Sequence, residues 1–306
     1  MSVRFSVLIP AYNREKYVTE AVDSVLSQTF RDFEVLAVDD GSTDNTLQVL
    51  ESYGSRIRVL RQSNQGPEVA RNTAAKVARG EYLVLLDSDD LMLPHALMSY
   101  ERIIRSFDSP PVIIGAMTEF SGQYAQHTAS EGTPELRVLK FKDYLSKDVP
   151  VAVSSSRIVL RKSVFKEVGG LRNTTASTFH LDSLNLILRV GTYSPCIVVR
   201  TPNTVGYRRH EGNTVRQLKP ISQGIRVLAR TERDGQYPGG RERSFERRSL
   251  IGSLSLSWSL SQCLRRGRVI LAFRLLTNTA PMVVAALLKK LRTCLFRRRT
   301  SELLVP

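Results

Sequence analysis

The 306-residue sequence has few of the features that define zinc-finger, disulfide-rich or membrane-spanning proteins. Its three cysteines, Cys196, Cys263 and Cys294, lie far apart without a CxxC pair, which argues against a zinc site and a disulfide framework. No uninterrupted apolar run reaches the about 18 residues that a spanning helix needs. The first apolar run is short and is cut by Pro10, so we expect no cleaved leader. These absences predict a cytoplasmic, reducing location.

Glycine-rich phosphate loops are also missing. The sequence has no GxxxxGK motif, and the turn after the first predicted strand reads PAYN, where a dinucleotide-binding fold would place its glycines. P-loop nucleotidases and Rossmann-type dehydrogenases are therefore poor candidates for this chain.

The formal net charge of +15 is concentrated in the last third of the chain. Residues 1–200 carry 23 basic and 23 acidic side chains, whereas residues 201–306 carry 21 basic and 6 acidic ones. A neutral body with a basic tail predicts that the tail contacts an anionic partner. No zinc finger, RNP-type aromatic pattern or recognition-helix signature accompanies the charge, so we expect no nucleic acid.

The basic tail also contains an apolar helical face. Five side chains in this segment recur at helical spacing: Val284, Leu287, Leu288, Leu291 and Leu295. Lys289, Lys290, Arg292 and the basic run 297–299 lie among and after them. This combination predicts a helix that lies on an anionic membrane surface, peripheral to the inner face of the membrane. The alternative is a terminal helix that packs on the body and has a solvated basic end.

Apolar strands alternate with amphipathic helices over the first hundred residues. We expect strands at Val3–Ile9, Phe33–Val38, Ile57–Leu60 and Tyr82–Leu86. Asn13 and Ser42 are expected to cap the first two helices, and Pro67 to lie in the first turn of the third. Because the strands are apolar throughout, they predict an α/β fold with a parallel-rich sheet covered by helices on both faces.

Acidic residues follow two of the predicted strands. Asp39 and Asp40 end the second strand, and Asp87, Asp89 and Asp90 follow the fourth. In a parallel sheet these strand ends meet at one edge, where ligands bind. Carboxylates gathered there repel one another unless a cation offsets them, and hard oxygen ligands suit Mg²⁺ or Mn²⁺. Taken singly, each cluster is also typical of a turn or a helix cap.

A second interpretation of the LLDSD segment stays open at this point. A phosphatase that uses an aspartyl nucleophile, here Asp87, would also place this pattern after a strand.

Two long segments of the sequence resemble family 2 glycosyltransferases of the GT-A fold. They read VLIPAYNREKYVTEAVDSVLSQTFRDFEVLAVDDGSTDNT and NQGPEVARNTAAKVARGEYLVLLDSDD. The resemblance is dense over residues 3–95, thinner to about residue 215 and absent beyond. It implies a nucleotide-sugar-binding half at 1–110, an acceptor-binding half at 111–216 and a basic, mainly helical extension at 217–306.

The resemblance implies an inverting transferase that moves a sugar from a UDP-linked donor to an acceptor hydroxyl. Its acceptor would be a saccharide or a lipid-linked saccharide, as in surface polysaccharide or glycolipid assembly. Site residues follow from the matched motifs. The donor would contact Pro10, Ala11, Tyr12, Asp39, Asp40, Arg71, Asp87 and Ser88. Asp89 of the DxD pair, with His210 of the YRRHEGNT segment, would hold Mg²⁺ or Mn²⁺.

The expected general base departs from the family pattern. Family members usually carry a Glu-Asp pair at the start of a helix that reads like DLWLR, whereas this chain reads HLDSLNLILR. Asp182 therefore aligns with the usual glutamate, and Ser183 with the usual base. Because serine has no useful basicity, either Asp182 takes the role or the protein is a sugar-nucleotide-binding protein with little or no catalysis. Alone, Asp182 is equally typical of a helix N-cap.

Overall fold

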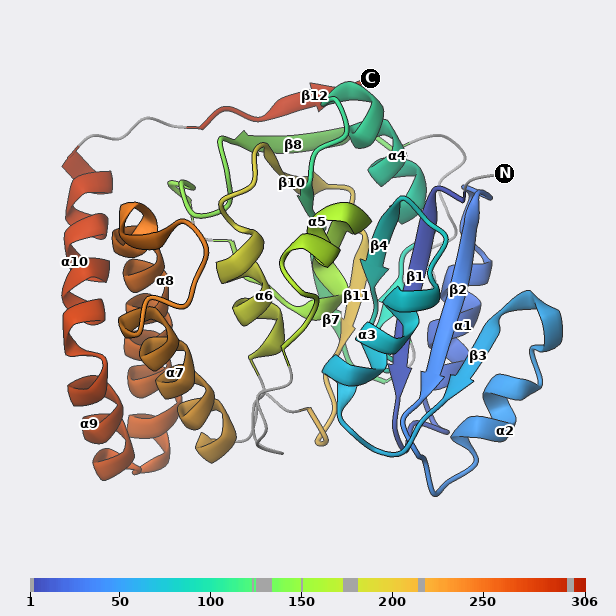
Figure 1. Ribbon diagram of the computed structural model, residues 1–306, viewed down its shortest axis with the longest axis horizontal. Helices are drawn as coiled ribbons and strands as arrows, with labels where there is room; N and C mark the ends of the chain where they lie inside the picture. Colours follow the sequence, from blue (N-terminus) through green and yellow to red (C-terminus); the bar gives the residue numbers. More distant parts are fainter. Residues whose placement is uncertain are drawn as a thin grey trace.

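A computed structural model describes residues 3–122, 124, 134–149, 151–172, 181–213, 218–295 and 300–306 (Figure 1). Nine strands of these residues form one large sheet: β1 (Phe5–Ala11), β2 (Phe33–Asp39), β3 (Arg58–Arg61), β4 (Tyr82–Leu85), β6 (Val112–Ile114), β8 (Leu136–Phe141), β9 (Ile158–Arg161), β10 (Cys196–Thr201) and β12 (Leu303–Val305). A smaller sheet contains β5 (Leu91–Met92), β11 (Val205–Arg208) and β7 (Met117–Phe120).

The large sheet is parallel where it is formed by the N-terminal strands and mixed where it is formed by the later ones. Its order is β12-β8-β10-β6-β9-β4-β1-β2-β3. Strands β3, β2, β1 and β4 are parallel, so their carboxyl ends share one edge. Strand β9 enters antiparallel between β4 and β6. The parallel half therefore presents the predicted acidic residues at a single edge.

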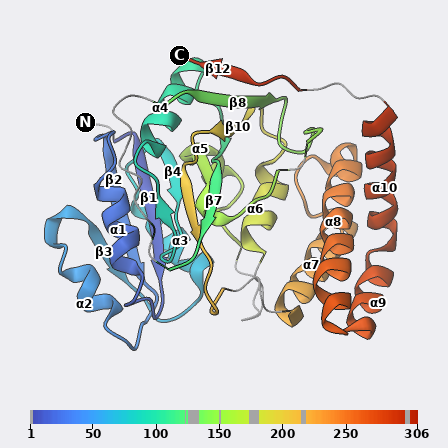
Figure 2. The same cartoon turned by 180° about the vertical axis from the view of Figure 1, so that it is seen from behind.

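Helices cover both faces of the large sheet, as the alternation of apolar strands predicts. These helices are α1 (Val18–Leu26), α2 (Thr46–Glu51), α3 (Pro67–Val77), α4 (Ala96–Ser106), α5 (Lys162–Glu167) and α6 (Asp182–Val190). Four more follow in the chain: α7 (Leu218–Arg233), α8 (Ser244–Trp258), α9 (Val269–Asn278) and α10 (Ala280–Leu295). In β1, Leu8 faces the core under α3 and α6, while Val7 and Ile9 face the core under α1 and α4 (Figures 1 and 2). This architecture confirms the predicted fold class.

The first four strands form where the sequence predicts them, but two predicted helix caps are wrong. Asn13 adopts φ 51° and lies before α1, and α2 begins only at Thr46. Instead, the Asn13 side-chain oxygen accepts a hydrogen bond from the Thr43 N–H at 2.9 Å, and the Ser42 hydroxyl accepts one from the Asn13 N–H at 3.0 Å. Both side chains therefore join the loops after β1 and β2, because these loops meet at the sheet edge.

The C-terminal third is helical, as expected, and its last strand returns to the sheet. Helices α7 to α10 form a layer beside the sheet, and β12 pairs antiparallel with β8 (Figure 1). Within the described residues no single helix has the length and apolarity that crossing a membrane requires; α9 and α10 meet that test only as a pair, bent by 79°. The predicted division at residues 110 and 216 stays a prediction.

Helices α8 and α10 cross at Gly252. A Cβ atom added to Gly252 would lie 1.9 Å from the Met282 carbonyl oxygen, so the α10 backbone occupies the space that a side chain would need. Gly252 and Met282 are both buried. The close crossing brings α8 and α10 together along one wall of the cavity described below.

We predict that Gly252→Val separates α8 from α10 and lowers the free energy of unfolding. Overpacking of this kind costs about 1–3 kcal/mol of stability. Here the added side chain would meet the backbone of α10, which cannot move aside as a flexible side chain can. Thermal denaturation followed by circular dichroism measures the change. Ser257→Val, at an exposed position of the same helix, is the matched control and should leave the melting temperature nearly unchanged. Equal stability of both variants would contradict the close crossing.

Candidate active site

One cavity of about 1350 Å³ begins at the carboxyl ends of β1, β2 and β4. It gathers most of the residues that the resemblance singles out: Pro10, Ala11, Tyr12, Asp40, Arg71, Asp87, Ser88, Asp89 and Asp182. Asp39 and His210 do not line it, although His210 contacts Asp89. Segments far apart in the sequence therefore converge on one site, as ligand-binding edges of parallel sheets do.

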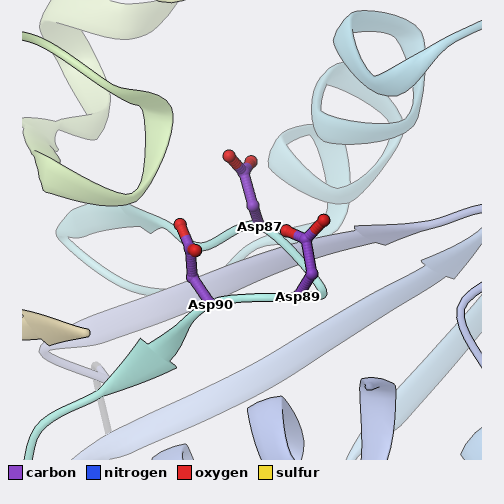
Figure 3. A group of neighbouring side chains, drawn as sticks. All are labelled: Asp87, Asp89 and Asp90. Carbon is purple, nitrogen blue, oxygen red and sulfur yellow. The ribbon is translucent and has the colours of Figure 1, made fainter. Parts of the chain in front are cut away.

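The loop after β4 carries three carboxylates that point to the same side (Figure 3). One oxygen from each of Asp87, Asp89 and Asp90 lies within 4.8 Å of the others. Ser156 holds the loop in place, because its hydroxyl donates to Asp90 at 2.6 Å and accepts from the Asp87 N–H at 3.0 Å. The Arg208 N–H donates to the second Asp90 oxygen at 3.0 Å.

Burial and crowding destabilise the charged forms of Asp87 and Asp90. Burial raises the pKa of Asp87 to about 6; Arg71 opposes this shift, and the charge of Asp89 adds to it. Burial, with the charges of Asp87 and Asp89, also raises the pKa of Asp90 well above its usual value. Such crowding is typical of a site that a cation completes.

The donor set fits a hard divalent cation. Asp90 uses both oxygens in hydrogen bonds, whereas Asp87 Oδ2 and Asp89 Oδ1 have no hydrogen-bond partner among the described residues. Two carboxylate oxygens in a cleft that opens to substrate match the way Mg²⁺ and Mn²⁺ bind between carboxylates and phosphates. Asp87 and Asp89 would hold such an ion.

His210 approaches the cluster from the loop after β11. Its Nε2 lies 3.0 Å from Asp89 Oδ2, and its ring stacks on Tyr17 with centroids 4.9 Å apart. Arg14 Nε lies 3.5 Å from the same Asp89 oxygen. The residue pair expected to share the metal is thus brought together, and Arg14 adds a positive charge where a diphosphate would need one.

Arg71 is the buried centre of the site. Its side chain is 3% exposed, and its two terminal nitrogens bind different carboxylates: Nη2 binds Asp87, and Nη1 donates to Asp182 Oδ2 at 2.9 Å. Asp87 follows β4, whereas Asp182 begins α6. The guanidinium therefore joins the donor-side carboxylate to the expected base.

The loop after α5 is held by α3, the helix that carries Arg71. The Asn72 side chain donates to the Leu171 carbonyl at 2.6 Å and accepts from the Leu171 N–H at 2.9 Å. Arg189 of α6 is fully buried and donates to the Val168 and Gly170 carbonyls at 2.8 and 2.6 Å. These contacts explain why Asp182 faces Arg71 although 111 positions separate them.

Asp40 contacts the loop that leads into α3. It accepts hydrogen bonds from the Gln62 side chain at 2.8 Å, the Gln65 N–H at 3.0 Å and the Gly66 N–H at 2.8 Å. Asp40 therefore shapes the donor end of the cavity as well as lining it. Asp39 is fully buried, and its side chain accepts a hydrogen bond from the Ser42 N–H at 3.2 Å.

Three site residues have no counterpart in the sequence-based expectations. Glu68 lines the cavity, and burial together with the charge of Asp182 raises its pKa to about 7. In the sequence, a glutamate after Pro67 is typical of any helix start, so it carries no signal. Arg14 and Ser156 were not singled out either, because their partners lie far away in the chain.

Comparison with known proteins identifies the family. The model described as "Glycosyl transferase family 2" matches residues 6–169, which is more than half of the chain. This chain belongs to glycosyl transferase family 2. It is 29% identical over 240 residues to the glycosyltransferase GlyG of Streptococcus pneumoniae serotype 4, covering 71% of this chain and 74% of that protein.

A second relative is the poly(ribitol-phosphate) beta-N-acetylglucosaminyltransferase TarS of Staphylococcus aureus. The identity is 36% over 143 residues, which is 45% of this chain but only 25% of TarS. The crystal structure of TarS residues 1–349 with UDP-GlcNAc superposes with a TM-score of 0.67 at 20% identity, covering 92% of this chain and 82% of that one. The family 2 resemblance and the GT-A-like fold are thereby confirmed.

We predict that Asp89→Asn abolishes the Mn²⁺-dependent part of UDP affinity. The substitution keeps the side-chain volume but removes a charge from the pair that would hold the cation. Titration calorimetry with UDP, in Mn²⁺ and in EDTA, measures the effect. Asp234→Asn, at an exposed site outside the cavity, is the matched control. Undiminished Mn²⁺-dependent affinity in Asp89→Asn would contradict the assignment.

Proposed function

We propose that this family member transfers a sugar from a UDP-linked donor to an acceptor hydroxyl, with inversion at the anomeric carbon and Asp182 as the base. The observation that carries the proposal is the position of Asp182 in the same cavity as Asp87 and Asp89, with Arg71 between them. The TarS structures with UDP and with UDP-GlcNAc support a nucleotide-sugar donor.

The residues divide the reaction between two ends of the cavity. At the base end, Asp182 accepts the proton of the acceptor hydroxyl as its oxygen bonds to the anomeric carbon. At the donor end, the diphosphate oxygen leaves with the electrons of the broken glycosidic bond, and Arg14 and Arg71 stabilise the developing charge. A divalent cation held by Asp87 and Asp89 supplies further neutralisation of the diphosphate when bound.

Ser183 supports a second candidate, a sugar-nucleotide-binding protein without transferase activity. It lies next to Asp182 on the cavity wall, where the family usually carries its base. The two candidates differ in one respect only, namely whether Asp182 accepts a proton. Membership of the glycosyl transferase family gives no support to the aspartyl phosphatase alternative.

We predict that Asp182→Asn lowers donor hydrolysis and sugar transfer about 10²–10⁴-fold, the usual contribution of a positioned base. UDP affinity should stay within a few-fold of the wild-type value, because the donor end is unchanged. UDP release from UDP-linked sugars, measured with a coupled assay, gives the rate.

Ser183→Ala, one position along the same helix, is the matched control and should leave the rate nearly unchanged. A rate that falls in Ser183→Ala but not in Asp182→Asn would contradict the assignment of the base. A wild-type protein that binds UDP-sugars in Mn²⁺ and never releases UDP would favour the binding protein.

We also propose that the C-terminal helices hold the enzyme on the inner face of an anionic membrane, in surface polysaccharide or glycolipid assembly. Two groups of exposed side chains support this, and we call them together the C-terminal apolar surface: Val269, Ile270 and Phe273 of α9, and Val284, Leu287, Leu288 and Leu291 of α10. Exposed basic residues lie next to them in the sequence, namely Arg265, Arg268, Arg274, Lys290 and Arg292. Apolar contact and positive charge together favour an anionic lipid surface.

We predict that the double variant Ile270→Asp, Phe273→Asp loses at least tenfold in affinity for vesicles that contain anionic lipid. These side chains are 72% and 68% exposed, so the change leaves the core intact. Co-sedimentation with mixed phosphatidylglycerol and phosphatidylcholine vesicles measures binding. The control is the double variant Ser52→Asp, Ser55→Asp, which adds the same two charges at exposed positions just after α2, away from this surface. Sedimentation of the double variant at the wild-type level would contradict the membrane proposal.

A further inference from the structure

The cavity extends well beyond the donor and the expected base. From Asp182 it continues between the loop after β8 and the helices α8 and α10. This second stretch, which we call the trough, has a mainly apolar lining: Val149, Val151, Leu250, Leu254, Leu260 and Leu287. A saccharide alone would fit such walls poorly, because its hydroxyl groups need hydrogen-bond partners that aliphatic side chains do not supply.

Two lysines face the trough without a carboxylate partner. Lys147 is 7% exposed, and its Nζ donates to the Tyr144 carbonyl at 3.3 Å; Lys289 Nζ of α10 donates to the Leu145 carbonyl at 3.3 Å. Within the part of the chain that the structure describes, neither ammonium forms an ion pair. A buried ammonium without a counter-charge is costly, and an anionic ligand offsets that cost.

The surroundings of the lysines agree with an anion site. Burial and repulsion from Lys289 lower the pKa of Lys147 to about 7. The nearby carboxylates are engaged elsewhere: Asp143 pairs with Arg243 at 2.6 Å, and Asp148 accepts from Thr300 at 2.6 Å. Cys196 and Glu246 are the other titratable groups that affect the two lysines.

The trough borders the C-terminal apolar surface. Leu287 belongs to both, because it lines the trough and is also 47% exposed on the face that it shares with Val284, Leu288 and Leu291. An apolar chain lying in the trough therefore has a continuous apolar path to the surface that we propose to contact lipid. The opposite end of the same cavity reaches Asp182 and the donor site.

We propose that the trough binds the lipid of an amphiphilic acceptor, with an anionic phosphate of that acceptor held between Lys147 and Lys289. The acceptor hydroxyl then lies toward Asp182, the phosphate at the two lysines, and the hydrocarbon along α8 and α10. The acceptor class is thus a lipid phosphate that carries a saccharide. This inference rests on the proposed function and names the acceptor of the same site.

Farnesyl phosphate, a short lipid monophosphate, tests the trough directly. Titration calorimetry below its aggregation concentration should show saturable binding to the full chain, with one molecule per protein. Ser253→Trp fills the trough from an exposed position of α8, and Lys289→Gln removes one of the two charges. Each should weaken farnesyl phosphate at least tenfold, and Thr277→Trp, at an exposed site outside the cavity, should leave the affinity unchanged.

Two further ligands separate the parts of the proposal. Farnesol should bind more weakly than farnesyl phosphate in the wild type, and Lys289→Gln should leave farnesol binding unaffected. Inorganic phosphate that binds as tightly as farnesyl phosphate would overturn the lipid assignment. Farnesyl phosphate binding that does not saturate, or that is equal in Ser253→Trp and the wild type, would also overturn it.

UDP titrations on the same proteins separate this proposal from the proposed function. All three variants should bind UDP in Mn²⁺ as the wild type does, because their changes lie away from the donor end. A wild type that fails to bind farnesyl phosphate, but binds UDP and shows Asp182-dependent turnover, would refute the trough alone. A wild type that binds farnesyl phosphate but no UDP-sugar would instead refute the transferase.

Discussion

The repulsion among carboxylates at one edge of the sheet, and the positive charges that offset it, decide how this protein is built around its cavity. Burial, together with the carboxylates that lie within 4.8 Å of one another, raises the pKa of Asp87 and of Asp90. Arg71 offsets part of that shift by binding Asp87, and its own side chain is only 3% exposed. The remaining unpaired oxygens are what make the edge suited to a cation and a diphosphate.

Arg71 also couples the donor and acceptor sides of the site. Its second carboxylate partner, Asp182, belongs to a helix outside the dense region of family resemblance. The base expected by family pattern is absent at Ser183, but a carboxylate still reaches the same cavity wall. Arg71 thereby keeps Asp182 at the acceptor side while it also binds Asp87 at the donor side.

The C-terminal helices extend the same cavity beyond the donor end. The α8–α10 crossing at Gly252 lies beside the trough and places Lys289 on its wall. The outer side of α9 and α10 exposes apolar side chains among basic ones, whereas the inner side of α10 buries Met282. One helical layer thus has one face toward the sheet and another that, in the proposal made above, would contact an anionic lipid surface.

The local sequence determined the alternation of strands and helices in the first hundred residues, and with it the gathering of acidic residues at one sheet edge. Periodicity sets which face each segment buries, and parallel order sets where the strands end. Only the tertiary structure decided that Asn13 and Ser42 join two loops, that Arg71 binds Asp182, and that Lys147 and Lys289 share a trough. These pairs are far apart in the chain, and their meeting depends on helix crossings and loop paths that no local spacing encodes.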